Sequence, residues 1–168
     1  VKADIAIFPI QLRAAENDLV LLNDKIKSDI DAVDTFLKEY GFDKSEITLS
    51  APQMTDKYAN DYGNSNIRFR YLANTTLTIY TKKVDKVVQL SQDLFKLAEK
   101  GVLATNDKYE TKFMFTGLNT LKPAMIEEAT KNARQAALKF AKDSNSKLGK
   151  IKNANQGYFS INNRDSGT

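Results

Sequence analysis

Strict alternation of apolar and polar residues over residues 67–79 constrains the fold of this chain more than any other feature of its sequence. One face of the expected strand carries Ile67, Phe69, Tyr71, Ala73, Thr75, Leu77 and Ile79. The other face carries Arg68, Arg70, Asn74, Thr76 and Thr78. A period of two with one apolar side is typical of a strand that packs on a core with one face and meets water with the other. We therefore expect an antiparallel sheet that is covered on one side only.

Other segments are expected to join this sheet. Residues 4–13 place four apolar side chains on one face: Ala6, Phe8, Ile10 and Leu12. Pro9 has no N–H to donate, which predicts an edge strand or a bulge. Shorter strands are expected at 47–51 and 109–116, and a last one around Tyr158, Phe159 and Ile161.

Three helices are expected between these strands. The first helix ends at Gly41, and its apolar stripe is Leu22, Ile26, Ile30, Val33, Leu37 and Tyr40. The second ends at Gly101, and its stripe is Val87, Leu90, Leu94, Leu97 and Ala98. The third begins at Asn119 or Thr120, with Pro123 in its first turn. Because Ala129, Ala133, Ala137 and Phe140 recur at three- and four-residue steps, we predict that Ala133, Ala137 and Phe140 are buried and that the two alanines contact another element.

The order of these elements is βαββαβ followed by αβ. It predicts an α+β fold in which helices cover one face of an antiparallel sheet, with a ferredoxin-like βαββαβ core and a further helix and strand. Neither a repeat nor a low-complexity linker divides the sequence, so residues 1–168 are expected to form a single domain.

The residue types that are missing restrict the chemistry. The 168 residues contain no histidine and no cysteine. Nucleophile systems that depend on either residue are excluded, as are zinc and most transition-metal sites. Catalysis would need carboxylate, lysine or tyrosine chemistry, and Asp29, Asp31 and Asp34 are expected to spread over the solvent side of the first helix. We predict that the protein is not an enzyme and holds no cofactor or metal.

Charge and hydropathy indicate the setting. The net charge of +4 comes mainly from dispersed lysines, so no nucleic-acid partner is expected. No run approaches the roughly 20 apolar residues of a membrane-spanning helix. No signal-peptide pattern is visible at the N-terminus. We expect the gene to encode a signal peptide that this sequence does not include.

The candidate site is the polar stretch from Met54 to Asn66, which we expect to form a long loop. Met54, Tyr58 and Tyr62 are the candidate interaction residues, because aromatic side chains are enriched in interface cores. The alternative is that both tyrosine rings fold back onto the sheet. The oxygen-rich positions of this stretch do not match the spacing of an EF-hand: Asp56, Asn60, Asp61, Asn64 and Asn66.

Three runs of residues resemble the SIMPL-domain family. The first spans residues 132–149 and contains Ala133, Arg134, Ala137, Ala141, Leu148 and Gly149. The second is Gly41 to Leu49, and the third is the strand Tyr71 to Tyr80 with the helix that ends at Gly101. The sequence departs from the family in its opening strand, which lacks the usual glycines, and in its end at Thr168, where the final strand is incomplete or short.

The resemblance implies a periplasmic or outer-membrane-associated bacterial protein that self-assembles or binds an envelope partner, with a link to envelope or oxidative stress. A homo-oligomer is expected on the same ground. Two other hypotheses are a small-ligand-binding module, with Tyr71, Phe113 and Phe115 lining a pocket, and an enzyme that uses carboxylate or lysine chemistry.

Overall fold

The structure is a computed structural model that describes residues 2–60, 68–107, 109–155 and 157. The chain divides into two compact units, Val1–Met114 and Phe115–Thr168, and each is described by itself. The expectation of a single domain stays a prediction.

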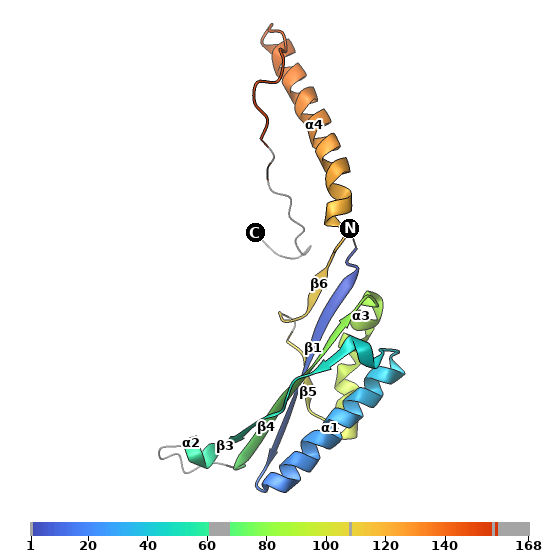
Figure 1. Cartoon of the computed structure of the whole chain (residues 1–168), viewed down its shortest axis with the longest axis vertical. Coiled ribbons are helices and arrows are strands. Elements are labelled where there is room, and N and C mark those ends of the chain that lie inside the picture. Colours follow the sequence, from blue (N-terminus) through green and yellow to red (C-terminus); the bar gives the residue numbers. More distant parts are fainter. Residues whose placement is uncertain (1, 61–67, 108, 156, 158–168) are drawn as a thin grey trace. The chain divides into compact units, whose positions relative to one another are not determined.

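The first unit is built on a six-stranded antiparallel sheet (Figure 1). Its two long strands, β1 (Ile5–Glu16) and β4 (Tyr71–Thr81), pair along nearly their whole length. The free side of β4 pairs with β2 (Ile47–Leu49) and β3 (Gln53–Asp56), and the free side of β1 pairs with β5 (Ala104–Thr105) and β6 (Lys112–Met114). The strand order is therefore β2-β4-β1-β5, which confirms the predicted antiparallel sheet. The ferredoxin-like assignment itself stays a prediction.

The register of β1 with β4 places the apolar faces of both strands on the same side. Phe8 lies opposite Ile79 and Ile10 lies opposite Leu77, and all four side chains are buried. Burial of a side chain of this size stabilises the fold by about 1.5–3 kcal/mol, so this double row is a main source of stability. The alternation predicted one-sided burial, and the structure confirms it for residues 73–79.

Pro9 lies in an interior strand, and the prediction of an edge strand or a bulge is wrong. Its pairing with Thr78 of β4 is regular. On the other side, β6 pairs with residues 5–7 and β5 pairs with Gln11 and Leu12, so Pro9 falls in the gap between them. The side chain of Asn106 enters this gap and donates a hydrogen bond of 2.6 Å from Nδ2 to the Pro9 carbonyl. The missing N–H therefore costs no ladder bond.

Helix α1 (Leu19–Glu39) covers one face of the sheet. Asp18 caps it by accepting hydrogen bonds from the N–H groups of Val20 and Leu21. Gly41 ends it in the left-handed region at φ 81°, where a side chain would be strained. The predicted stripe is confirmed, because Leu22, Ile26, Val33 and Leu37 are buried against the sheet.

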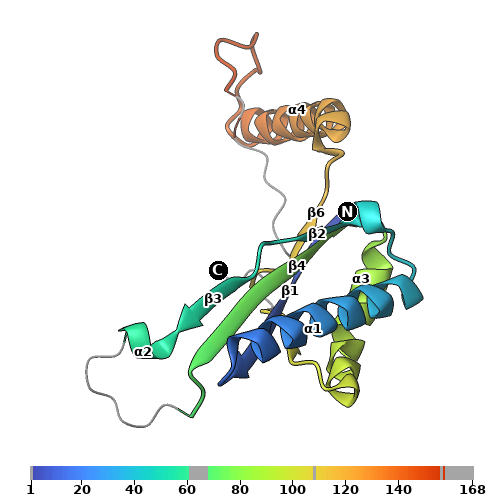
Figure 2. The same cartoon turned by 60° about the horizontal axis from the view of Figure 1, so that its bottom comes forward.

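The second predicted helix consists of α3 (Val84–Asp93) and a 3₁₀ segment, η2 (Leu94–Lys100). Gly101 ends it at φ 72°, as its place in the sequence predicts. Val87, Leu90, Leu94 and Leu97 are buried in the same core as α1, so both helices cover the same face (Figure 2). Ala98 is exposed, because the tighter 3₁₀ winding turns it out of the stripe.

Several predicted boundaries are corrected. The expected loop at 54–66 contains most of strand β3 and a short helix, α2 (Lys57–Asn60), because its first residues pair with β4. The central strand begins at Tyr71, and residues 61–67 lie outside the described part of the chain. The strand expected at 109–116 is shortened to β6, and its Phe113 is 39% exposed because β6 lies at an open edge of the sheet.

The second unit contains helix α4 (Leu118–Asp143). It begins before the predicted start, so Pro123 lies in its second turn. The prediction that Ala133, Ala137 and Phe140 are buried is wrong: α4 has no buried residue, and Phe140 is 77% exposed. Among residues 144–155 and 157 the unit has no other helix or strand to pack on this face. The predicted strand around Tyr158, Phe159 and Ile161 lies outside the described residues.

Candidate interaction site

Two of the three predicted interaction residues lie on adjacent short elements. Met54 belongs to β3 and is 43% exposed, and Tyr58 belongs to α2 and is 60% exposed. Neither ring nor thioether is buried on the sheet, so the alternative that Tyr58 folds back onto it is not observed. Tyr62 lies outside the described residues. The pairing of β3 with β4 holds this segment, with Met54 opposite Ala73.

Arg70 organises the neighbourhood of Tyr58. Its guanidinium forms a two-pronged ion pair with Asp56, with Nε at 3.2 Å from both carboxylate oxygens and Nη2 at 2.8 Å from Oδ2. The guanidinium also lies 5.4 Å from the centre of the Tyr58 ring and 4.8 Å from that of Tyr71. Cation–π contacts of this kind prefer arginine. Asp56, Tyr58 and Arg70 therefore form one cluster with Tyr71.

The electrostatics of this cluster are those of a fixed ion pair. Hydrogen bonds from Arg70 are the main cause that lowers the pKa of Asp56, against the opposing effect of burial. The same hydrogen bonds raise the pKa of Arg70. Both groups stay ionised at neutral pH, and neither is poised to transfer a proton. The cluster can present an arginine and a tyrosine to a partner, which are residue types enriched in interface hot spots.

The sequence did not reveal Arg70 as part of the site, because the alternation of residues 67–79 placed it only on the solvent-exposed face of the strand. The backbone N–H of Arg70 has a separate, structural role. It donates a hydrogen bond of 2.9 Å to Oδ1 of Asn17 and so joins the end of β1 to the start of β4. Asp56 and Arg70 are separated by a stretch without regular patterning. No sequence signal links them.

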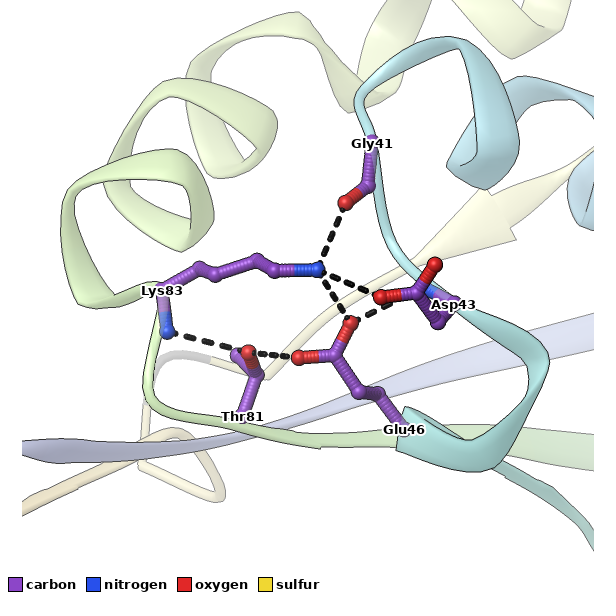
Figure 3. A network of polar contacts seen from close by, with 5 residues as sticks. All are labelled: Gly41, Asp43, Glu46, Thr81 and Lys83. Atoms are coloured by element: carbon purple, nitrogen blue, oxygen red, sulfur yellow. Dashed lines mark hydrogen bonds and ion pairs between the residues drawn. The ribbon is translucent and has the colours of Figure 1, made fainter.

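A second polar network joins the end of α1 to the start of α3 (Figure 3). The Lys83 ammonium donates to the Gly41 carbonyl at 2.9 Å, to Oδ2 of Asp43 at 2.8 Å and to Oε2 of Glu46 at 2.7 Å. Glu46 lies in the 3₁₀ turn η1 (Lys44–Glu46) and accepts a further hydrogen bond from the Thr81 hydroxyl. Asp43 and Glu46 form a capping box, in which the Asp43 N–H donates to Glu46 at 2.8 Å.

The carboxyl of Glu46 is strongly biased toward its ionised form. Burial alone would raise its pKa, but the Asp43 N–H, the Lys83 ammonium and the Thr81 hydroxyl outweigh burial and lower the pKa to about 2. Hydrogen bonds to Asp43 and Glu46 raise the pKa of Lys83 correspondingly. The network is therefore a permanent ion cluster that fixes two loops. The Asp-Lys-Ser-Glu run at 43–46 is the sequence signal that could have indicated its acidic half.

One predicted solvent-side carboxylate is in fact buried. Asp29 is 3% exposed, and it pairs with the ammonium of Lys25 one turn earlier on α1. Lys25 also donates to the Gly101 carbonyl at 3.1 Å, so the pair ties α1 to the end of η2. The expected spread of Asp29, Asp31 and Asp34 over the solvent side is wrong for Asp29.

A third contact of this kind joins the end of α1 to the end of α3. The Tyr40 hydroxyl donates to Oδ2 of Asp93 at 2.6 Å, and this hydrogen bond is the main cause that raises the pKa of Tyr40. Lys96 pairs with the same carboxylate at 2.8 Å and is the main cause that lowers the pKa of Asp93. The arrangement is structural, since all three groups keep their ordinary charge at neutral pH.

No metal site is found in the described part of the chain, and two of the residues expected to line an aromatic pocket, Tyr71 and Phe113, lie beside opposite ends of β1. Over residues 2–60, 68–107, 109–155 and 157, no group of three or more carboxylates gathers closely enough to hold a metal ion. Tyr71 packs on the core and on Arg70, whereas Phe113 lies at the open edge formed by β6. None of the described helices is long and apolar enough to cross a membrane.

The first unit is thus an α+β domain whose antiparallel sheet is covered by helices on one face, with ion clusters that fix its loops. The family model for SIMPL, described as a protein of unknown function (DUF541), matches residues 1–167, and the chain belongs to this family. No curated protein matches the sequence.

Proposed function

We propose that this SIMPL protein is a non-enzymatic component of the bacterial cell envelope, located in the periplasm, that acts by assembling with further copies of itself. The observation that carries the proposal is helix α4. It is 26 residues long, has no buried residue, and displays large apolar side chains that include Phe140 and Leu138.

An unpartnered helix of this kind is unfavourable by itself. Isolated helices depend on packing of an apolar face for most of their stability. The second unit offers α4 no other helix or strand among its described residues, and a second copy of α4 would supply a surface for it to pack on. Ala129, Ala133 and Ala137 lie on one face, and small side chains allow a second α4 to approach closely along it.

A non-enzymatic role is supported by the residue types of the whole sequence. It contains no histidine and no cysteine, and the ion clusters of the first unit hold their carboxylates in the charged state. Catalysis by carboxylates needs two groups with separated pKa values facing one reacting atom. The periplasmic location and a link to envelope or oxidative stress are part of the proposal, and the family resemblance is their only support.

Sedimentation velocity of the purified protein tests the assembly. We expect an oligomer that dissociates in the variants Ala133→Glu and Ala137→Glu. Gln135→Glu is the matched control, because it adds the same charge on a different face of α4 and should leave the oligomer intact. A protein that is monomeric at high concentration, or variants that dissociate equally in all three cases, would refute assembly through this face. Cell fractionation with a periplasmic marker tests the location.

A further inference from the structure

An open depression of about 580 Å³ lies where α3 begins. Four lysines line it, Lys2, Lys82, Lys83 and Lys86, and we call this the lysine pocket. Among the described residues that line it, Asp85 is the one acid. It is open to solvent on one side, so it can admit a small polar ligand without enclosing it. The pocket therefore combines room for a ligand with a concentrated positive charge.

The four lysines are not equivalent. Lys83 is neutralised within the fold by Asp43 and Glu46 at 2.8 and 2.7 Å. For Lys2, Lys82 and Lys86, no carboxylate of residues 2–60, 68–107, 109–155 or 157 lies within ion-pair distance. These three ammonium groups are available to a ligand.

Two of the ammonium groups also converge on one point. Lys83 donates to the Gly41 carbonyl at 2.9 Å, and a Cβ placed on Gly41 would collide with the ammonium of Lys86. Because Gly41 has no side chain, it leaves room for the ammonium of Lys86. The nearby ammonium of Lys83 is already paired with carboxylates. Lys83 and Lys86 thus bring two like charges to the same glycine, and an anion bound by Lys86 would offset their repulsion.

We propose that the lysine pocket binds a phosphate group that carries at least two negative charges, through Lys2, Lys82 and Lys86. Lysine ammonium groups act as compact point charges on flexible stems, which suits a tetrahedral polyvalent anion better than a planar carboxylate. Lys83 lines the pocket but does not bind the phosphate, because its ammonium is already paired with Asp43 and Glu46.

Isothermal titration calorimetry of the whole chain at low salt tests the site, with pyrophosphate and inorganic phosphate as probes. The test variant is Lys82→Gln with Lys86→Gln. Its matched control is Lys139→Gln with Lys142→Gln on α4, which removes the same net charge elsewhere. We expect the test variant to weaken pyrophosphate binding at least about tenfold, because it removes two charges that contact the ligand. The control should change binding less than about twofold, because salt screens charges that lie far from the pocket. Thermal unfolding of both variants checks that each is folded.

A second arm separates the two sources of such a phosphate. Vesicles of phosphatidylcholine with and without phosphatidic acid are sedimented with the protein and with both variants. Pyrophosphate binding that depends on Lys82 and Lys86 supports a soluble phosphate ligand, whereas sedimentation with phosphatidic acid that depends on the same lysines supports a lipid headgroup. Equal losses in test and control variants, or no binding in either arm, would overturn the proposal. The outcome is independent of assembly through Ala129, Ala133 and Ala137, because the test variant leaves α4 unchanged. The two lysines of the control lie on a different face of that helix.

Discussion

Replacement of Glu46 by glutamine tests whether the Lys83 network stabilises the fold. Glutamine keeps the size of the side chain and can still accept the Asp43 N–H, but it loses the charge that pairs with Lys83. A pKa lowered from 4.5 to about 2 corresponds to about 3 kcal/mol of stability at neutral pH when nothing screens it. The Lys83 side chain is 34% exposed, and solvent screening reduces this value. We expect Glu46→Gln to lower the free energy of unfolding by about 1–2 kcal/mol.

The pH dependence identifies the cause. Because the folded-state pKa of Glu46 lies below its ordinary value of 4.5, its contribution is fully present above that value and is lost as the pH falls toward about 2. The difference between wild type and Glu46→Gln, measured by urea unfolding, should therefore be largest at neutral pH and shrink over this window. Asp34→Asn, which breaks the exposed pair with Lys38, is the control and should change the free energy of unfolding by less than about 0.5 kcal/mol. A difference that does not depend on pH would refute the electrostatic explanation.

Three further changes probe the first unit, each by urea unfolding. Phe8→Ala should cost about 3–5 kcal/mol, because the ring is fully buried between the sheet and its covering helices; a cost below about 1 kcal/mol would contradict the assigned core. Gly101→Ala should cost about 1 kcal/mol, since φ is 72° and a Cβ would meet no neighbouring atom. Asn106→Ala should cost about 1 kcal/mol by removing the bond to the Pro9 carbonyl, and the double variant with Pro9→Val should show whether the two positions are coupled.

Periodicity predicted the elements that have two unlike faces. β1, β4 and α1 each bury the face that their apolar residues mark, because one side of the sheet is covered and the other is open. Pro9 was misplaced because a missing N–H constrains only the neighbouring strand, and the sequence does not show that β5 and β6 leave a gap there. Tertiary pairing, rather than local preference, decided this case.

The small residues of α4 misled for a different reason. Alanine has the highest helix propensity and fits both a close packing contact and an exposed surface. The stripe from Ala129 to Ala137 therefore predicts a helix but does not say whether its face is covered. Among the described residues of the second unit, no other helix or strand covers this face. A stripe of several large apolar residues would predict a covered face. The alanine stripe of α4 contains one such residue, Phe140, and this is too little to predict burial.

The candidate site could be predicted only where its residues are close in sequence. Met54 and Tyr58 were identified from composition, but Arg70 and Lys83 enter their clusters through strand pairing and a loop contact. Each has a carboxylate partner more than ten residues away, at Asp56 and Glu46 respectively. Long-range ion pairs of this kind depend on the register of β3 with β4 and on where α1 ends. Neither is encoded in a local pattern.

Asp29 shows that position on a helix can outweigh residue type. It lies three residues after Ile26 and four before Val33, which places it on the buried stripe of α1, yet its charge suggested the solvent side. The fold accepts it because Lys25, one turn earlier, supplies a countercharge and also reaches the Gly101 carbonyl. A buried carboxylate without such a partner would be strongly unfavourable. A lysine four residues before an acid on an apolar stripe is therefore a local signal that the acid can be buried.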